Sequence, residues 1–377
     1  MPILSICIPT FNRADLLKLA LQSLLPQVAE LKGKVEVIVS DNCSTDHTQQ
    51  VVEIMQRNGP IRYYRNSTNI GAARNINCVA SELAAGEFCW ILGDDDMIIQ
   101  GKLSKLVGII EAHSHIDYFF VNYCQQWVEV RNRLIVEKNS SYSPTPQESM
   151  CQDFSERLMP NWLQILSIDA QKPAELHTAI VCHVFRRSIW RAEIDPIKLN
   201  AINPDKLISS FDTDFLHINV LARATLGKPV YYIGDPCVLL GIGHQEWWKY
   251  LSTVMLGHLH EAMDLYRSLG ADERIIEHHH RHLLSYSGPY IWRTLFKPNS
   301  KQDYLLLLKL FRRFWMYKDL WMSLVDAVVN AVRPWFTQWL RMRARRFLPG
   351  PLYVLLRAAW RLPRALSRFK ARAGSRP

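Results

Sequence analysis

Three consecutive aspartates, Asp94, Asp95 and Asp96, directly follow the apolar run Phe88–Leu92. The run has the length and composition of a buried strand, and Gly93 marks its end. Three carboxylates in a row repel one another unless a positive charge lies among them. Mg²⁺ or Mn²⁺ takes one or two carboxylates together with phosphate oxygens. The triplet therefore indicates a divalent-cation site for a phosphorylated substrate, and an acidic turn that caps the next helix is the alternative.

The first hundred residues alternate between strand and helix patterns. The predicted strands are Ile3–Ile8, Val35–Val39, Ile61–Tyr64 and Phe88–Leu92. Apolar residues recur at helical spacing before Pro26, and a second helix should run to Met55 behind a capping box of Asp46 and Gln49. This alternation predicts a parallel sheet covered by helices, with ligands bound beyond the carboxyl ends of the strands.

Polar residues follow each of the four predicted strands. They are Pro9, Thr10, Asn12 and Arg13 after the first, Asp41, Asn42 and Ser44 after the second, Asn69, Gly71, Arg74 and Asn75 after the third, and the three aspartates after the fourth. Because the carboxyl ends of parallel strands meet at one edge, we expect these side chains to lie close together.

These clusters, in this order, resemble the nucleotide-binding half of family-2 glycosyltransferases. The resemblance is dense over residues 3–100 and looser to residue 245. It implies the GT-A fold, an α/β Rossmann-like mixed, mainly parallel sheet flanked by helices. It also implies an inverting transfer of a sugar from a nucleotide-sugar donor, with Mg²⁺ or Mn²⁺ as the cofactor.

The same resemblance assigns roles to the clusters. Pro9, Thr10, Asn12, Arg13, Asn42 and Ser44 would line the nucleotide pocket, Asp41 would accept hydrogen bonds from the base, and Gly71, Arg74 and Asn75 would approach the ribose or diphosphate. Asp94 would lie nearest the ribose, Asp96 is the expected metal ligand, and Asp95 would serve either role. Gly93 stands where the family commonly has a further acidic residue, and Asn69–Gly71 is alternatively a simple turn.

Inverting transfer requires a carboxylate that removes the proton of the acceptor hydroxyl. The family usually supplies it from a Glu-Asp pair at the start of a helix, and here Asp214 is the preferred base with Asp212 as its rival. The alternative is that both aspartates only cap that helix. His244, among glycines, matches a histidine that reaches the metal or diphosphate, although a solvated loop histidine is the other interpretation.

Three further segments carry polar or ionisable residues. Residues 177–187 resemble a strand of the family near the acceptor, and residues 142–149 suit an acceptor loop or an insertion. The histidines within 277–282 follow one another directly, so they point around a helix instead of to one face. We therefore expect a solvated helix there, and no metal site.

The eight cysteines include no C-x-x-C pair, which favours free thiols, a reducing compartment and no structural zinc. The amino terminus does not resemble a secretory signal, and no apolar window is long enough for a spanning helix.

Most of the net charge of +10 comes from the last part of the chain. Residues 301–377 contain 17 Lys and Arg and 3 Asp and Glu, whereas the rest carries 28 basic and 32 acidic residues. Helical spacing of arginines with tryptophans and leucines predicts amphipathic helices on an anionic membrane surface. The density of large apolar residues argues against nucleic acid as the partner.

These observations predict three parts: a transferase domain over 1–245 (nucleotide half 1–100, acceptor half 101–245), a helical connection over 246–300 and a basic helical tail over 301–377. Enzymes of this resemblance act on polyprenyl-diphosphate-linked glycans in bacterial surface polysaccharide and O-antigen synthesis, which implies a cytoplasmic protein on the inner membrane face. A sugar-phosphate nucleotidyltransferase is one alternative, but the loop after the first strand lacks the expected glycines. A catalytically inactive membrane scaffold is the other.

Overall fold

The computed structural model describes residues 1–127, 145–194, 199, 203, 210–243, 249–298 and 301–331. In this part of the chain a nine-stranded sheet has the order β3-β2-β1-β4-β8-β6-β9-β5, with β7 paired to β9. The strands are β1 Leu4–Thr10, β2 Val35–Asp41, β3 Ile61–Arg65, β4 Phe88–Ile91, β5 Met97–Ile98, β6 Tyr118–Trp127, β7 Glu156–Met159, β8 His183–Arg186 and β9 Val230–Ile242.

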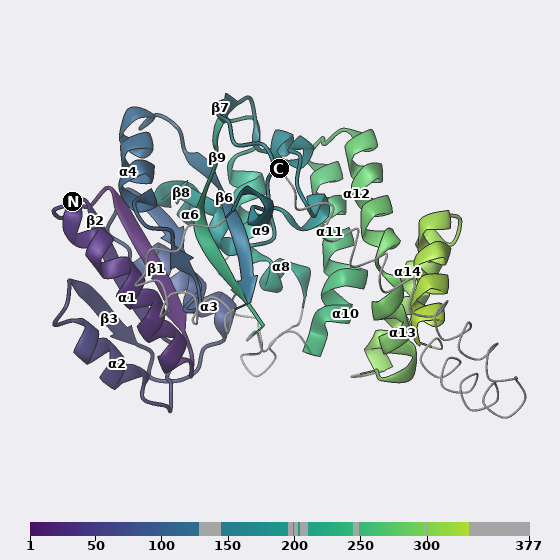
Figure 1. Cartoon of the computed structure of the whole chain (residues 1–377), viewed down its shortest axis with the longest axis horizontal. Coiled ribbons are helices and arrows are strands. Elements are labelled where there is room, and N and C mark those ends of the chain that lie inside the picture. Colours follow the sequence, from purple (N-terminus) through teal and green to yellow (C-terminus); the bar gives the residue numbers. More distant parts are fainter. Residues whose placement is uncertain are drawn as a thin grey trace, which may run out of the picture.

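Helices cover the sheet and continue beyond it into a stack of antiparallel helices (Figure 1). The α-helices are α1 Ala14–Glu30, α2 Thr48–Met55, α3 Ala72–Asn77, α4 Lys102–Ala112, α6 Arg187–Glu193, α8 Phe211–Asp214, α9 Leu216–Ala224, α10 Leu251–Thr253, α11 Leu259–Ser268, α12 Glu273–Ser285, α13 Gly288–Phe296 and α14 Lys301–Phe314. A π-helical turn, η7 Val254–His258, joins α10 to α11. Residues 318–331 are helical as well.

The strand pairing confirms the expected α/β fold with a mixed sheet. β3, β2, β1 and β4 pair in parallel, and in this register Thr10 lies opposite Asp41, which lies opposite Arg65. The polar clusters that follow these strands therefore meet at one edge. Beyond β4 the pairing changes, because β8 is antiparallel to both β4 and β6.

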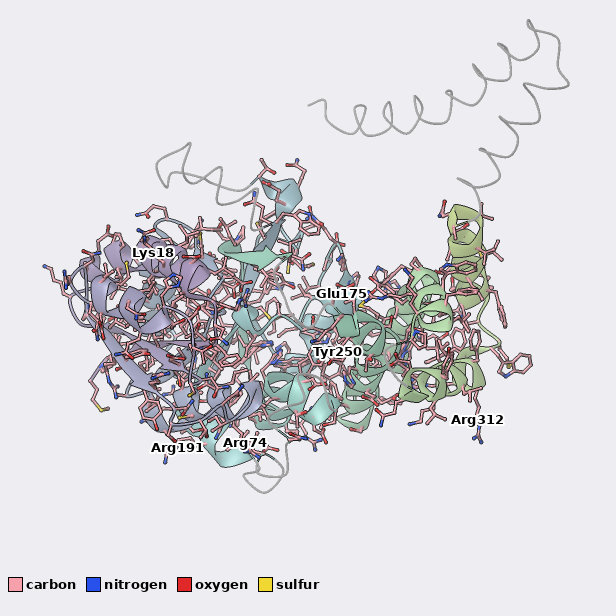
Figure 2. All side chains as sticks on the ribbon, turned by 90° about the horizontal axis from the view of Figure 1, so that it is seen from below. Lys18, Arg74, Glu175, Arg191, Tyr250 and Arg312 are labelled. Atoms are coloured by element: carbon pink, nitrogen blue, oxygen red, sulfur yellow. The ribbon has the colours of Figure 1, made fainter. Side chains whose placement is uncertain are left out.

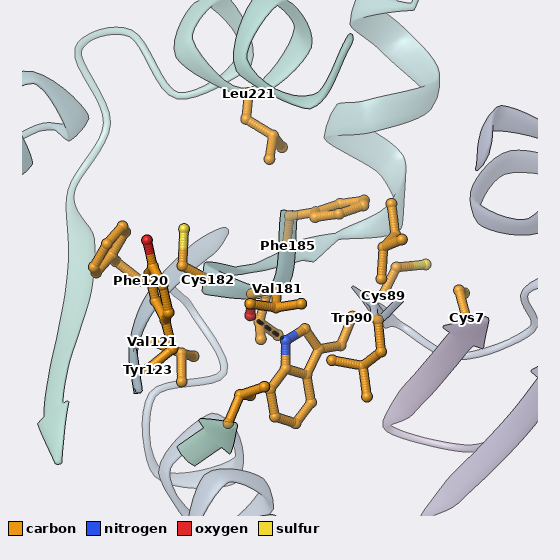
Figure 3. Close-up of a cluster of buried hydrophobic side chains, with 14 of the residues drawn as sticks. Cys7, Cys89, Trp90, Phe120, Val121, Tyr123, Val181, Cys182, Phe185 and Leu221 are labelled. Carbon is orange, nitrogen blue, oxygen red and sulfur yellow. Dashed lines mark hydrogen bonds between the residues drawn. The ribbon is translucent and has the colours of Figure 1, made fainter. Parts of the chain in front are cut away.

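The centre of the core lies around β4, whose four residues are all buried. Trp90 Nε1 donates a hydrogen bond to the carbonyl oxygen of Val181 at 2.7 Å, which satisfies the indole inside the core (Figure 3). The same apolar cluster reaches from Leu4 to residues of α11 and α12, including Tyr266 and Leu283. The apolar core thus continues past residue 245. The predicted boundaries at residues 245 and 300 stay predictions.

A second apolar cluster joins α13, α14 and residue 320. Its buried members are Leu256, Leu284, Ile291, Leu307, Leu310, Phe314 and Leu320. Gly257 in η7 lies against α14, since a Cβ on it would be 3.0 Å from Leu306 Cδ1. The first helix of the basic tail is therefore packed directly on the turn that precedes α11.

Some local predictions fail. α1 does not end at Pro26 but continues to Glu30, because Leu24, Leu25 and Val28 bury an apolar stripe that outweighs the hydrogen bond lost at proline. The capping box is also wrong. Asp46 accepts from the backbone N of Ala14 and Thr48, while Gln49 bonds Glu53.

The histidines of α12 are not all solvated, contrary to expectation. His279 and His280 are buried, and His279 Nε2 lies 2.9 Å from the carbonyl oxygen of Leu166. In the 177–187 segment only His183–Arg186 forms a strand, preceded by a 3₁₀ turn, Ile180–Cys182. All eight cysteines are free thiols, as predicted. Among the described helices, none is long and apolar enough to cross a membrane.

Candidate active site

The loop between β1 and α1 contacts the aspartate triplet directly. Thr10 Oγ1 donates a hydrogen bond to Asp94 Oδ2 at 2.7 Å. The Arg13 guanidinium lies across two carboxylates, with Nη1 2.9 Å from Asp94 Oδ1 and Nη2 2.6 Å from Asp95 Oδ2. Because these contacts join the ends of β1 and β4, the first and fourth polar clusters form one site.

The triplet places three acidic side chains together in a buried position. Asp94, Asp95 and Asp96 are all buried. Burial raises the pKa of Asp94 to about 7, although the Arg13 guanidinium beside it acts in the opposite direction. Carboxylate oxygens that lack sufficient positive charge suit Mg²⁺ or Mn²⁺. No three His, Cys, Asp or Glu side chains of the described residues converge on one point, so such a cation would need phosphate oxygens as further ligands.

Asp96 has backbone partners on both of its oxygens. Its Oδ2 accepts from the backbone N of Gly93 at 2.7 Å, and its Oδ1 accepts from the backbone N of Gly241 at 3.0 Å. Gly241 belongs to β9, so Asp96 ties the loop after β4 to a distant strand. Asp95 in turn pairs with Arg13, so the choice between Asp95 and Asp96 as the direct metal ligand, including the sequence-based preference for Asp96, stays a prediction.

Gly93 lies against the same carboxylates. A Cβ on this residue would lie 2.6 Å from Asp96 Oδ2 and 2.9 Å from Asp95 Oδ1. Distances this short require the two carboxylates to shift. The acidic residue that the resemblance leads one to expect here would therefore disturb the bond between Asp96 Oδ2 and the backbone N of Gly93.

The end of β2 is joined to the end of β1. Asp41 Oδ1 accepts from the backbone N of Ser44 at 2.8 Å, and Ser44 Oγ accepts from the backbone N of Asn12 at 2.9 Å. Asn12 has a positive φ of 54°, a conformation that asparagine tolerates better than most residues. Asp41 also accepts from Tyr63 Oη at 2.6 Å, a contact that with burial raises the pKa of the phenol.

The third cluster is held by a chain of amides. Asn42 Nδ2 donates to Asn69 Oδ1 at 2.7 Å, and Asn69 Oδ1 also accepts from the backbone N of Gly71 at 2.9 Å. Asn75 is buried and accepts from Ser40 Oγ at 2.7 Å. Asn69–Gly71 can thus be a simple turn and still lie beside the second cluster. Sequence analysis missed Ser40 and Tyr63, whose hydroxyls bond Asn75 and Asp41.

Arg74 is half-buried and lies at the lower edge of the molecule in Figure 2. Its Nε donates to the carbonyl oxygen of Leu199 at 2.9 Å. Pro9 is the penultimate residue of β1 and lies in parallel register with Ser40 of β2. The predicted roles of Pro9 and Arg74 in donor binding stay predictions.

The two candidate bases lie in one helical turn, α8, but in different surroundings. Asp212 is exposed. The Asp214 side chain is only 6% exposed, and its Oδ2 lies 2.9 Å from Nε2 of His258, whose side chain is 8% exposed. A base must reach the acceptor hydroxyl, so accessibility favours Asp212. Sequence analysis missed His258, because its partner lies in another part of the chain and no motif surrounds it.

Some predicted positions lie outside the described residues. They are His244, residues 142–144 of the 142–149 segment and the tail beyond residue 331. The described end of that segment, Ser149, is buried against Asn122, whose Nδ2 donates to its Oγ at 2.7 Å.

Comparison with known proteins places this site in a family. Residues 5–189 match the model of glycosyl transferase family 2, a range that includes all four strand-end clusters. The chain belongs to glycosyltransferase family 2. The family accounts for the order of polar residues after β1 to β4 and for the sheet that brings them together.

Curated relatives match about a third of this family-2 chain. Abequosyltransferase RfbV of Salmonella typhimurium is 37% identical over 116 residues, 30% of this chain and 34% of the relative. A GalNAc(5)-diNAcBac-PP-undecaprenol beta-1,3-glucosyltransferase of Campylobacter jejuni is 36% identical over 118 residues, 31% of this chain and 37% of the relative. The chain thus spans about a third of the length of these relatives.

A solved structure extends the fold likeness beyond the matched segment. Staphylococcus aureus TarS 1–349 in complex with UDP-GlcNAc superposes with a TM-score of 0.54 at 17% identity, covering 88% of this family-2 chain and 92% of TarS 1–349. The likeness includes most of the chain, so the fold of the transferase family continues past the four clusters.

The role of Asp96 can be tested by stability. Asp96→Ala leaves the backbone N–H groups of Gly93 and Gly241 without their acceptor, and we expect unfolding free energy to fall by about 1–3 kcal/mol for each buried group. Denaturant unfolding of Asp96→Ala measures this loss, with Asp15→Ala, an exposed aspartate of α1, as the control. An unchanged midpoint for Asp96→Ala would show that the two backbone bonds contribute nothing.

Proposed function

We propose that the protein transfers a sugar from a nucleotide-sugar donor to a glycan acceptor in bacterial surface polysaccharide synthesis, with inversion at the transferred carbon. The carrying observation is the contact of Thr10 and Arg13 with Asp94 and Asp95, which unites the ends of β1 and β4 in a family-2 domain. Two curated relatives are named as glycosyltransferases, and TarS was solved with UDP-GlcNAc.

The donor nucleotide would lie along the carboxyl ends of β1 and β2. Asp41 there offers carboxylate oxygens to the N–H groups of a base, while the loop of Asn12 and Ser44 closes one side. Arg74 and Asn75 follow Gly71, whose φ of 85° and lack of a side chain allow the backbone to approach a ligand closely.

A divalent cation, Mg²⁺ or Mn²⁺, would be held by Asp95, with Asp94 beside it. When bound, such a cation stabilises negative charge on a departing diphosphate. Arg13 contacts both aspartates and so fixes the orientation of their carboxylates before the donor arrives. Preorganised charges of this kind cost no rearrangement when the bond breaks.

Asp212 would act as the base. It takes the proton from the acceptor hydroxyl, and the hydroxyl oxygen forms a bond to the anomeric carbon of the sugar. The bond between that carbon and the diphosphate breaks at the same time, and its electron pair leaves with the nucleoside diphosphate. Attack from the face opposite the leaving group inverts the carbon.

Ligand binding tests the donor site. We expect one nucleoside diphosphate among UDP, GDP, CDP and TDP to raise the melting temperature in the presence of Mn²⁺, since ligand at a hundred times Kd stabilises by about 2.7 kcal/mol. Asp95→Asn should lose the Mn²⁺-dependent part of this shift, whereas Asp15→Asn should keep it. Stabilisation by nucleoside triphosphates alone would favour a nucleotidyltransferase, and no response to any nucleotide would favour an inactive scaffold.

Replacement of each aspartate of α8 distinguishes the two candidate bases. Asp212→Asn should lower kcat by about 10²–10⁴-fold without loss of stability, because the side chain is exposed and its proton transfer is lost. Steady-state transfer assays and thermal unfolding of both variants provide the measurement. Near wild-type kcat in Asp212→Asn, together with an inactive but stably folded Asp214→Asn, would restore Asp214 as the base.

We further propose that the acceptor is lipid-linked, on a polyprenyl diphosphate, and that the protein lies on the inner face of the cell membrane. The Campylobacter relative is named for an undecaprenol-linked substrate. In this chain, α14, the turn after it and helix 318–331 carry large exposed apolar residues. They are Tyr304, Leu305, Leu308, Trp315, Met316, Trp321, Met322, Val325, Val328 and Val329. Leu308 is 66% exposed and Met316 is 77% exposed.

Basic side chains accompany this apolar face. Lys309, Arg312 and Lys318 are exposed on the same two helices, and Arg312 points away from the body of the molecule in Figure 2. Residues 332–377 add 12 Lys and Arg and no Asp or Glu. Apolar and cationic groups together match an anionic lipid surface, where each nearby basic residue adds about 1 kcal/mol.

Vesicle flotation of the full chain tests this surface. We expect binding to vesicles that contain phosphatidylglycerol, and weak binding to pure phosphatidylcholine. Leu308→Glu with Met322→Glu should weaken binding at least about tenfold, because the charges must enter the lipid interface. Ile54→Glu, at an apolar residue of α2 that is also exposed, is the matched control. Equal binding of both proteins would exclude this face.

A further inference from the structure

His258 joins the helical connection to the turn that carries the candidate bases. It ends η7, directly before α11. Its Nε2 lies 2.9 Å from Asp214 Oδ2, and its Nδ1 lies 2.9 Å from Glu261 Oε2. With a hydrogen bond to Glu261 at Nδ1 and an ion-pair contact with Asp214 at Nε2, the imidazole suits the doubly protonated, cationic form.

Two aromatic rings lie beside this histidine. The ring of Phe211 in α8 lies 6.4 Å from the His258 ring, and that of Phe215, directly after α8, lies 6.2 Å from it. The ionisable groups that face it are Asp214 from α8 and Glu261 from α11. Burial alone would lower the pKa of His258, but the two carboxylates reverse this effect and raise it to about 9.

The turn α8 depends on such outside support. It consists of four residues, Phe211–Asp214, and no side chain caps its amino end. A single helical turn is not stable by itself, because the entropy lost in forming it exceeds the gain from one hydrogen bond. Asp214 is the buried charged anchor of this turn, and Asp212 is exposed on the same turn.

We propose that His258 is a positioning residue for the transfer reaction: as a cation it holds Asp214 and thereby orients the turn from which Asp212 meets the acceptor hydroxyl. This inference rests on the proposed function. It gives the helical connection a part in catalysis, because a residue beyond the matched family segment would set the position of the base.

Protonation of His258 has a defined effect on pH dependence. Its pKa is raised from an ordinary value of 6.5 to about 9, so its contribution is fully present below about pH 6.5 and is lost as the pH rises through about 9. We therefore expect kcat of the wild type to fall in the alkaline range, where the imidazole becomes neutral and releases Asp214.

The test compares His258→Gln with His279→Gln in transfer assays over a range of pH. His279 is an equally buried histidine, of α12, whose Nε2 lies against the carbonyl oxygen of Leu166. His258→Gln should lower kcat about 10–100-fold at neutral pH and remove the alkaline fall, as expected when a catalytic group is misplaced. KM for the donor should change little, since Arg13 and Asp95 are untouched. His279→Gln should lower the melting temperature but keep the alkaline fall.

Two results would overturn the inference. One is a His258→Gln enzyme with the kcat and the pH profile of the wild type. The other is an equal loss of kcat in both histidine variants, which would reflect general destabilisation. Failure of the proposed function itself looks different, because the wild type would then show neither nucleotide stabilisation nor turnover, and the inference would fall with it.

Discussion

The contact between Arg13 and the carboxylates of Asp94 and Asp95 is the interaction on which the rest of the site depends. Two buried carboxylates at the end of one strand repel each other, and the guanidinium brought by the neighbouring loop compensates part of that charge. The parallel pairing of β1 with β4 makes the contact possible, because it sets both loops at the same edge. A sheet with these two strands separated would leave the aspartates without a cationic partner.

Two kinds of support surround this contact. Backbone groups fix Asp96, through Gly93 and Gly241, and so hold the loop after β4 between the parallel and the mixed part of the sheet. Side-chain amides and hydroxyls fix the second and third clusters, as in the bond from Ser40 to Asn75. These bonds hold the strand-end edge together, whereas α8 is held by the burial of Phe211 and by the ion pair between Asp214 and His258 of η7, which lies outside the sheet.

The sequence predicted well which polar clusters meet at one edge of the sheet, because its signals there are local. Each strand is a short apolar run, each cluster follows directly, and parallel pairing then brings Thr10 to Asp94. The sequence did not predict contacts between residues that are far apart in the chain. The backbone bond from Gly241 that occupies Asp96, and the imidazole that anchors Asp214, depend on tertiary packing that no spacing reveals. The prediction that α1 ends at Pro26 was wrong for a related reason, since burial of the apolar side of α1 outweighs the local effect of the proline.

Gly257 connects the packing of α14 to the position of His258. This glycine is the immediate neighbour of His258, and its missing side chain is what lets Leu306 of α14 lie against the turn. One side of α14 thus carries exposed apolar and basic residues, while Leu306 on another side contacts Gly257, the neighbour of His258. A displacement of α14 would therefore act first on Gly257 and, through its neighbour His258, on Asp214 of α8.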